Sequence, residues 1–261
     1  MDLGLHGKTA LVLGASRGLG AAVARVLALE GATVIAAART PADVEAWRAE
    51  LPPAAAERVL AARVDMADLA SVEALARLAQ ECGGADILVN NGGGPPPGAA
   101  ADAAPGQWSA HFQPMAAHLF HLSGLLLPGM RERRWGRIIT IASSGVEQPI
   151  PNLALSNGIR AAVVGWSKTL ASEVARDGIT VNVVLPGRIH TDRVDQLDQS
   201  AAERQGKSRD DVKAASLATI PAGRYGRPEE FADMVAFLAS ERAGYVTGSR
   251  VRVDGGMIRA I

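Results

Sequence analysis

The fold is decided by the run Thr9-Ala10-Leu11-Val12-Leu13-Gly14-Ala15-Ser16-Arg17-Gly18-Leu19-Gly20 near the N-terminus. Its first five residues are apolar and β-rich, and the glycines lead into a helical, Ala/Val/Leu-rich segment that ends near Glu30-Gly31. Glycines in such a turn let the backbone approach a diphosphate, whose charge is favoured by the free N–H groups of the helix start. The turn therefore predicts a dinucleotide site, although a tight strand-to-helix turn without a ligand needs similar residues.

The same alternation of strand-like and helical segments continues along the chain. Further strands are expected at about Thr33–Ala37, Val59–Val64, Ile87–Asn90, Arg137–Ile141, Thr180–Leu185 and Arg250–Val253. This order predicts an α/β fold of the doubly wound, Rossmann type, with a parallel sheet covered by helices on both faces. Because no change in composition marks a second domain, residues 1–261 are expected to form one dinucleotide-binding domain.

Composition and charge point to a small-molecule partner. Hydrophobic residues make up 48% of the chain, and 27 basic residues balance 27 acidic ones. A chain without net charge has no general attraction to nucleic acid or an anionic membrane. The single cysteine, Cys82, suits a reducing compartment, and neither a signal peptide nor a membrane span is evident, so a cytoplasmic location is expected.

Two long irregular segments follow expected strand ends. The first, Gly92–Gly106, is rich in Gly, Pro and Ala, and the second, residues 188–226, is polar and charged. Loops of this length beside the strand ends of an open α/β sheet are often functional. We interpret residues 188–226 as a solvated helix-loop-helix lid whose apolar positions could face a substrate, namely Val194, Leu197, Val212 and Leu217.

The end of the second expected strand selects the cofactor. An NAD-binding fold places an acidic residue there to hold the ribose 2′-hydroxyl, whereas this chain has Ala36-Ala37-Ala38-Arg39. A guanidinium without a nearby carboxylate suits a 2′-phosphate, and Arg17 in the glycine turn offers a second cation. The sequence therefore predicts NADP(H), although Arg39 could also be an ordinary solvated loop residue.

Several motifs, in order, resemble those of the short-chain dehydrogenase/reductase family, particularly its 3-oxoacyl-acyl-carrier-protein reductase-like members. They cover nearly the whole chain: Gly14–Gly20, Asp65, Asn90-Asn91-Gly92-Gly93, Ile141-Ala142-Ser143-Ser144, Pro186-Gly187 followed by Thr191, and Val251–Gly256. The resemblance implies that Asp65 and Met66 meet the adenine, that Asn91 and Gly92 line the adenosine side, and that Ile189 and Thr191 hold the nicotinamide carboxamide. The full cofactor set expected here is Gly14, Ser16, Arg17, Gly18, Leu19, Gly20, Arg39, Asp65, Met66, Asn91, Gly92, Arg160, Pro186, Gly187, Ile189 and Thr191.

The catalytic half of the site departs from this family. Members of the family that this chain resembles use an Asn, a Ser and a Tyr-x-x-x-Lys pair as catalytic residues. The corresponding positions here are Met115, Ser143, Ser156 and Arg160. A serine hydroxyl is far less acidic than a phenol, and an arginine can hold a ribose but cannot join a proton relay as a lysine can. Ser143, Ser156 and Arg160 remain the expected catalytic residues.

Three hypotheses follow from this mixture. The first is an NADPH-dependent carbonyl reductase whose proton comes from water or from a differently placed side chain, with His190 and Glu147 as outside candidates. The second is an NADP(H)-binding sensor or partner subunit that lacks turnover. The third is other chemistry on the bound cofactor, such as elimination or isomerisation.

Two expectations concern metals and assembly. No metal site is expected, because His111, His118 and His121 are not accompanied by a carboxylate or cysteine cluster. The helical segments Gln107–Arg134 and Leu155–Asp177 are apolar on more than one face, as helices at subunit contacts are. In the family that this chain resembles, the corresponding helices form a dimer interface, so a homo-oligomer, a dimer or a tetramer, is expected.

Overall fold

The computed structural model describes residues 2–260. Within them, seven parallel strands form one sheet in the order β3-β2-β1-β4-β5-β6-β7. The strands are β1 (Thr9–Leu13), β2 (Thr33–Ala38), β3 (Val59–Arg63), β4 (Ile87–Asn90), β5 (Gly136–Ile141), β6 (Ile179–Pro186) and β7 (Arg250–Val253). The predicted doubly wound fold is confirmed. The strand order reverses between β1 and β4, which is the point where such sheets bind ligands.

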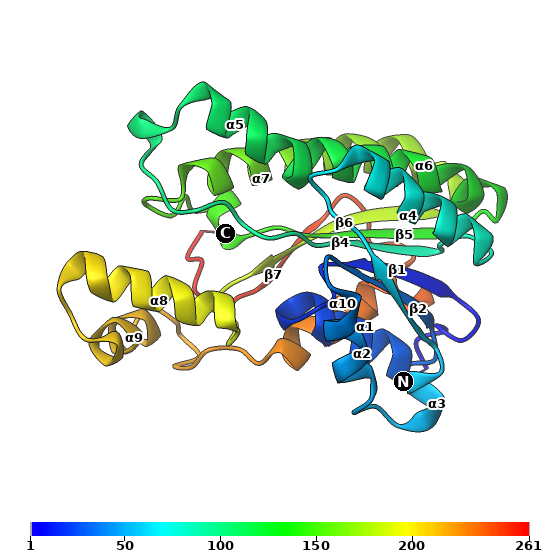
Figure 1. Cartoon of the computed structure of the whole chain (residues 1–261), viewed down its shortest axis with the longest axis horizontal. Helices are drawn as coiled ribbons and strands as arrows, with labels where there is room; N and C mark the ends of the chain where they lie inside the picture. Colours follow the sequence, from blue (N-terminus) through cyan, green and yellow to red (C-terminus); the bar gives the residue numbers. More distant parts are fainter. Residues whose placement is uncertain (1, 261) are drawn as a thin grey trace.

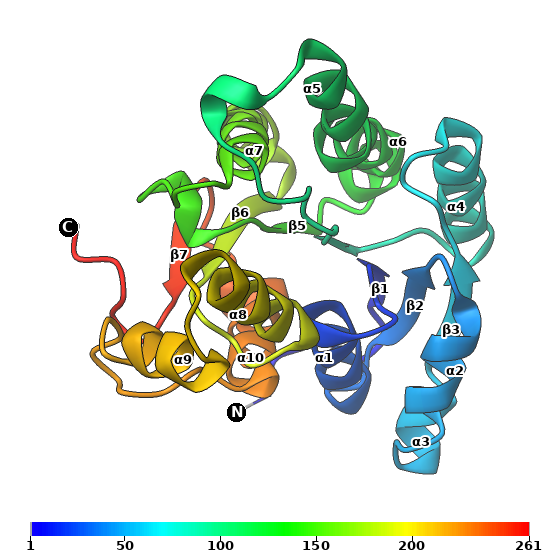
Figure 2. The same ribbon diagram turned by 60° about the vertical axis from the view of Figure 1, so that its left-hand side comes forward.

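Helices cover both faces of the sheet (Figures 1 and 2). On one side lie α1 (Gly18–Leu29) and α10 (Pro228–Ala239), with α2 (Pro41–Arg48) and α3 (Pro53–Ala56) near β2 and β3. The other face carries α4 (Leu69–Glu81), α6 (His118–Glu132) and α7 (Ala154–Val174). The two layers bury separate apolar clusters against the sheet, which is why β1, β4 and β5 are almost continuously buried.

The helical segment expected at Gln107–Arg134 is not one regular helix. It consists of α5 (Pro105–Phe112), a π-helical turn (Gln113–Ala117) and α6. Pro114 explains the change, because proline has no N–H to continue the regular ladder and its ring crowds the preceding turn. Met115 lies in this π-helical turn and packs against α7.

The second long helical segment, expected at Leu155–Asp177, is present almost as expected. Regular α7 ends at Val174, and one tighter turn, Ala175–Asp177, completes the segment. Gly178 then adopts a left-handed conformation with φ of 75°. Glycine is the residue that ends a helix in this way at least cost, so the chain can turn directly into β6.

Residues 188–226 contain two helices, α8 (Asp192–Gln205) and α9 (Arg209–Leu217), which lie together beside the end of β7 in Figure 1. The base of the segment is closed, since Gly226 N–H donates to the Arg188 carbonyl at 2.9 Å and His190 N–H donates to the Gly226 carbonyl at 2.8 Å. Most charged side chains of this segment are exposed, but Asp198 is 1% exposed, and the apolar residues Val194 and Val212 are also buried. Its opening and closing as a lid stays a prediction.

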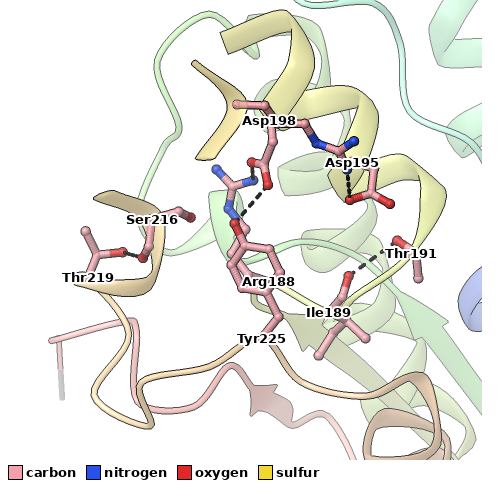
Figure 3. A network of polar contacts seen from close by, with 9 residues as sticks. Arg188, Ile189, Thr191, Asp195, Asp198, Ser216, Thr219 and Tyr225 are labelled. Carbon is pink, nitrogen blue, oxygen red and sulfur yellow. Dashed lines mark hydrogen bonds and ion pairs between the residues drawn. The ribbon is translucent and has the colours of Figure 1, made fainter. Parts of the chain in front are cut away.

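Asp198 is buried because it joins three parts of this segment (Figure 3). Its carboxylate accepts a hydrogen bond from the Arg188 guanidinium at 2.8 Å and another from the Tyr225 hydroxyl at 2.8 Å. Arg188 follows β6, Asp198 lies on α8, and Tyr225 follows α9. A buried carboxylate needs such partners, so this cluster fixes α8 over the end of β6.

Candidate active site

The glycine turn after β1 requires glycine at three positions, through its backbone angles or through lack of space. Gly14 and Gly18 have φ of 62° and 59°, and a Cβ added at Gly20 would lie 2.2 Å from the Gly14 carbonyl oxygen. Asn91 Nδ2 donates to the Leu13 carbonyl at 3.2 Å, which ties the turn to the end of β4. No side chain caps the start of α1, so its first N–H groups point outward without a partner of that kind. This cradle fits a diphosphate.

Trp47 on α2 also supports the glycine turn, and sequence reasoning missed it. Its indole N–H donates to the Ala15 carbonyl at 2.9 Å, and the residue is 5% exposed. Ala15 N–H in turn donates to the Ala37 carbonyl of β2 at 3.1 Å. Contacts from β2, from α2 and from the residue after β4 therefore hold the glycine turn in place. A large aromatic residue in the short helix α2 was the sequence feature that could have predicted this contact.

The expected adenosine side lies along the ends of β2 and β3. Arg39 is exposed directly after β2, and no acidic residue precedes it in this strand. Asp65 lies after β3, and the neighbouring Met66 carbonyl contacts His118 Nδ1 at 2.6 Å. The arrangement fits a nucleotide with a 2′-phosphate, because the cations near its edge are not opposed by a carboxylate on β2.

The expected nicotinamide side forms around the end of β6. Gly187 N–H donates to the Val253 carbonyl at 2.9 Å, and a Cβ added at Gly187 would lie 2.6 Å from Asp254 Cα. Thr191, just before α8, lies near the glycine turn, since a Cβ at Gly18 would be 3.7 Å from its methyl group. Gly18 and Thr191 are separated by about two thirds of the sequence, and the fold brings the motifs around them side by side.

Arg160 links the two central strand ends. Its guanidinium donates to the Ile141 carbonyl at 3.0 Å and to the Gly92 carbonyl at 3.4 Å. Burial, together with the charge of Arg193, lowers the pKa of Arg160 to about 10, so the side chain remains a cation at neutral pH. The contacts place this cation between α7, the end of β5 and the loop that follows β4.

A small cavity adjoins Arg160. Its volume, as space for the centre of a water molecule, is about 10 Å³, enough for one water. Polar lining comes from Arg160 and Thr140, whereas the remaining residues are small or apolar: Gly92, Gly93, Met115, Leu119, Ile141, Ala142 and Val163. Met115 is 8% exposed and packs with Leu155 and Ile159, so this position offers no polar side chain to a proton relay.

Ser143 and Ser156 lie on adjoining elements of the site. Ser143 follows the end of β5, and its Oγ accepts a hydrogen bond from Gly145 N–H at 3.0 Å. Ser156 is half-buried in the first turn of α7. Asn157, which sequence reasoning missed, donates to the Ile150 carbonyl at 2.9 Å, and a Cβ at Gly145 would lie 2.5 Å from its Oδ1. Asn157 therefore fastens the loop that carries Ser143 onto α7.

The two alternative proton donors, and the tyrosine of the segment after β6, are engaged elsewhere. Glu147 forms ion pairs with Arg250, at 3.5 Å, and with Arg252, both on the edge strand β7. The side chain of His190 is 64% exposed and lies 4.0 Å from Asp195. Tyr225 donates to Asp198, as described above. These contacts direct all three side chains to partners other than Ser143 or Arg160.

Within the described part of the chain, the remaining histidines do not form a metal site. His121 Nε2 lies 3.2 Å from a Glu73 oxygen on α4. Among residues 2–260, no three His, Cys, Asp or Glu side chains are grouped so that they could hold a metal ion. No helix in this part of the chain combines the length and apolar character needed to cross a membrane.

Comparisons with known proteins agree with this geometry. A family model described as enoyl-(acyl carrier protein) reductase matches residues 14–258. A 3-oxoacyl-acyl-carrier-protein reductase from Vibrio harveyi is 38% identical over 258 residues, which cover 98% of this chain and 99% of that protein. An L-sorbose reductase from Gluconobacter frateurii, solved with NADPH and L-sorbose, is 35% identical with a TM-score of 0.93, and each chain is covered completely, at 100%.

A third relative comes from polyketide synthesis. The actinorhodin polyketide ketoreductase, solved with NADPH as a point variant, is 34% identical with a TM-score of 0.89, and the match covers 96% of this chain and 97% of that one. All three matches extend over nearly the full length, and they include the glycine turn, the central strand ends and the segment after β6. The chain therefore belongs to the short-chain dehydrogenase/reductase family.

Proposed function

We propose that this protein is an NADPH-dependent carbonyl reductase that converts a ketone or 3-oxoacyl-type substrate to an alcohol. The observation that carries the proposal is the position of Arg160, which joins Gly92 after β4 to Ile141, two residues before Ser143. A fixed cation and a serine hydroxyl thereby lie at the strand ends where such sheets bind ligands. The relatives named above are reductases, two of them solved with NADPH, and this favours turnover over a binding-only role.

The residues around the glycine turn and the ends of β2, β3 and β4 would hold the cofactor. The free N–H groups at the start of α1 suit the diphosphate, Arg39 and Arg17 suit the 2′-phosphate, and Asp65, Met66 and Asn91 border the adenosine side. Pro186, Gly187, Ile189 and Thr191 border the nicotinamide side. NADPH, when bound, supplies the two electrons and the hydrogen that reduce the carbonyl carbon.

The chain's own residues bind and polarise the carbonyl. The reaction consumes one NADPH and one proton for each carbonyl group and yields the alcohol and NADP⁺. We assign to Ser143 a hydrogen bond to the carbonyl oxygen and to Arg160 the electrostatic stabilisation of the negative charge that develops there. The proton for that oxygen comes from water, because Ser156 is a weak acid and an arginine does not relay protons.

The assembly and the location of the protein belong to the same proposal. We infer a homo-oligomer, a dimer or a tetramer, from the extensive apolar surfaces of α6 and α7. Residues 188–226 serve as the lid over the substrate. A cytoplasmic location suits Cys82, which is an exposed free thiol.

A pair of serine variants tests the proposed function. Purified protein is mixed with NADPH and a panel of 3-oxoacyl thioesters, quinones and cyclic ketones, and the nicotinamide absorbance is followed. We expect Ser143→Ala to lower kcat about 100-fold, the usual loss of one donor to a developing oxyanion. Ser172→Ala, an exposed serine that bonds the Lys168 carbonyl on α7, is the matched control and should keep full activity.

A double variant separates a specialised site from a decayed one. Ser156→Tyr together with Arg160→Lys restores the residues that the family uses. A specialised site should lose activity in this variant, because the guanidinium contacts to Gly92 and Ile141 disappear. Gain of activity in the double variant, with no turnover by the unmodified protein, would contradict the proposed function.

A further inference from the structure

Two arginines converge on the loop that follows β4. Arg160 on α7 donates to the Gly92 carbonyl, and Arg193 on α8 donates to the Pro95 carbonyl at 3.2 Å. A Cβ added at Gly94, between these two points, would lie 3.4 Å from the Arg193 guanidinium. The two cations are close enough for the charge of Arg193 to lower the pKa of Arg160 further. Both guanidinium groups therefore border the same side of the site.

The three aspartates of α8 do not neutralise this pair. Asp192 lies 3.7 Å from Arg17, Asp195 pairs with Arg209 at 2.5 Å, and Asp198 pairs with Arg188 at 2.8 Å. Figure 3 shows that Asp195 and Asp198 are directed to these other partners. Within residues 2–260, the contacts of Arg160 and Arg193 are to backbone carbonyls, which are dipoles rather than charges.

Such a pair is unfavourable without an anion. Arg193 is exposed, whereas Arg160 is half-buried and carries a desolvation cost as a cation without a counter-ion. The repulsion between the two charges is stronger there than in water. Each guanidinium has five N–H donors and uses only one or two of them on the carbonyls named above. The remaining donors form the planar arrangement that binds carboxylates and phosphates well.

We propose that Arg193, with Arg160 behind it, binds a carboxylate of the substrate, so that the carbonyl compounds reduced by this protein are keto acids rather than neutral ketones. The proposal rests on the proposed function and narrows its substrate class. Arg193 is the specificity-determining residue, because it lies on α8 and its guanidinium reaches the loop after β4, where it donates to the Pro95 carbonyl. A phosphate of the cofactor has the same chemistry as a carboxylate toward an arginine, so the experiment must separate the two sources.

Matched substrates and matched variants provide that separation. The probes are 3-oxohexanoate and 2-oxohexanoate, each compared with its methyl ester, which has the same carbonyl but no charge. Arg193→Met removes the guanidinium and keeps an unbranched side chain. Arg204→Met is the control, since Arg204 is an exposed arginine in the last turn of the same helix. Circular dichroism and thermal melting confirm that both variants fold.

We expect the unmodified protein to reduce at least one of the acids with a kcat/KM at least about tenfold above that of its ester. Arg193→Met should lower kcat/KM on that acid by about 10- to 100-fold and change it less than about twofold on the ester, as expected for loss of a charged hydrogen bond. Arg204→Met should behave as the unmodified protein does. Added salt should raise KM for the acid and leave KM for the ester unchanged.

Two results would overturn the inference and leave the proposed function standing. One is an ester reduced as well as its acid. The other is an increase in the NADPH dissociation constant of Arg193→Met by the same factor as the loss in kcat/KM, which would assign the arginine to a cofactor phosphate. Titration calorimetry with NADPH alone measures that constant.

Absence of any turnover would count against the proposed function instead. Binding of 3-hydroxyhexanoate to the NADPH-loaded protein then decides the inference, because it requires no reaction. Heat of binding that is seen with the acid, lost in Arg193→Met and retained in Arg204→Met supports a carboxylate site. Equal binding of the acid and its methyl ester, or no binding of either, overturns it.

Discussion

Arg160 shows how one residue change reorganises a site. A lysine at this position has a single ammonium group, whereas the Arg160 guanidinium reaches the Ile141 and Gly92 carbonyls at the same time. The residue therefore links the end of β5 to the loop that follows β4 while it keeps a positive charge between them. Ser156, at the tyrosine position of the family's Tyr-x-x-x-Lys pair, is too short to occupy the place of a tyrosine. The positive charge of Arg160 is therefore the main group on α7 that can take part in catalysis.

Replacing this arginine tests its two roles together. Arg160→Lys keeps the positive charge but loses the planar guanidinium that reaches two carbonyls. We therefore expect kcat/KM for NADPH-dependent reduction to fall about tenfold or more, as when hydrogen bonds from a charged group are lost. Arg176→Lys, on an exposed arginine just beyond α7, should leave it unchanged. Steady-state kinetics measures both. An Arg160→Lys variant as active as the unmodified protein would show that the two guanidinium hydrogen bonds are not needed for activity.

Trp47 is a second residue with an effect beyond its own helix. In Trp47→Phe an aromatic ring keeps part of the packing, but the Ala15 carbonyl loses its indole donor. We expect unfolding stability to fall by about 1 kcal/mol and NADPH binding to weaken about fivefold, since the glycine turn becomes less well ordered. Thermal melting and NADPH titration check this. Unchanged NADPH affinity with reduced stability would mean that Trp47 supports the fold alone.

At the scale of elements, α8 is held by a buried cluster in addition to its surface ion pairs. Arg188, Asp198 and Tyr225 come from three different parts of residues 188–226 and meet at one carboxylate. The position of Arg193 on the same helix depends on this cluster. Any lid movement must therefore either carry the cluster along as one body or break two hydrogen bonds to a carboxylate that is 1% exposed.

Asp198→Asn weakens this attachment. The Arg188 side chain is 31% exposed, so water replaces part of the lost interaction, and we expect a stability loss of about 2 kcal/mol, below the value for a fully buried pair. The KM for the carbonyl substrate should rise more than the KM for NADPH, because α8 carries Arg193, to which we assign the substrate carboxylate. Asp210→Asn, an exposed acid at the start of α9, is the control. Equal increases in both KM values would argue against a role for α8 at the substrate.

The start of α10 gives a pH-dependent contribution. Hydrogen bonds from the Arg224 side chain and the Arg227 backbone lower the pKa of Glu230 from 4.5 to about 2. A pKa that is lower in the folded state adds stability above pH 4.5, and this stability is lost as the pH falls toward about 2. In Glu230→Gln, the melting temperature should therefore fall less across this pH window than in the unmodified protein. Parallel curves for the two proteins would contradict this assignment.

At the scale of the whole molecule, the sheet and the glycine turn could be predicted from the sequence because their signals are local. Each strand is a short apolar run, and the three glycines of the turn lie within seven residues. The supporting contacts could not be predicted in this way. His118 and Met66 are 52 residues apart, and Trp47 and Ala15 are 32 apart, so only the fold brings them together. Asp198 is similar, since among other charged residues it gave no sign of burial.

The departures in the catalytic half were visible in the sequence, but their consequences were not. Ser156 and Arg160 could be identified by their spacing from the motifs around them, whereas the reach of Arg160 to two strand ends depends on the distance between α7, β4 and β5. The approach of Arg193 to the loop after β4 depends in the same way on where α8 lies. Spacing identifies residues, and packing decides which of them act together.

Transfer of a labelled hydrogen tests the central claim most directly. The protein is incubated with NADPH that carries deuterium at the reactive C4 position and with the panel of ketones, keto acids and 3-oxoacyl thioesters, and the products are analysed by mass spectrometry. A carbonyl reductase should give an alcohol with one deuterium on the former carbonyl carbon for each NADPH consumed. Tight NADPH binding without deuterium in any alcohol would contradict the account and leave a protein that binds the cofactor without using it.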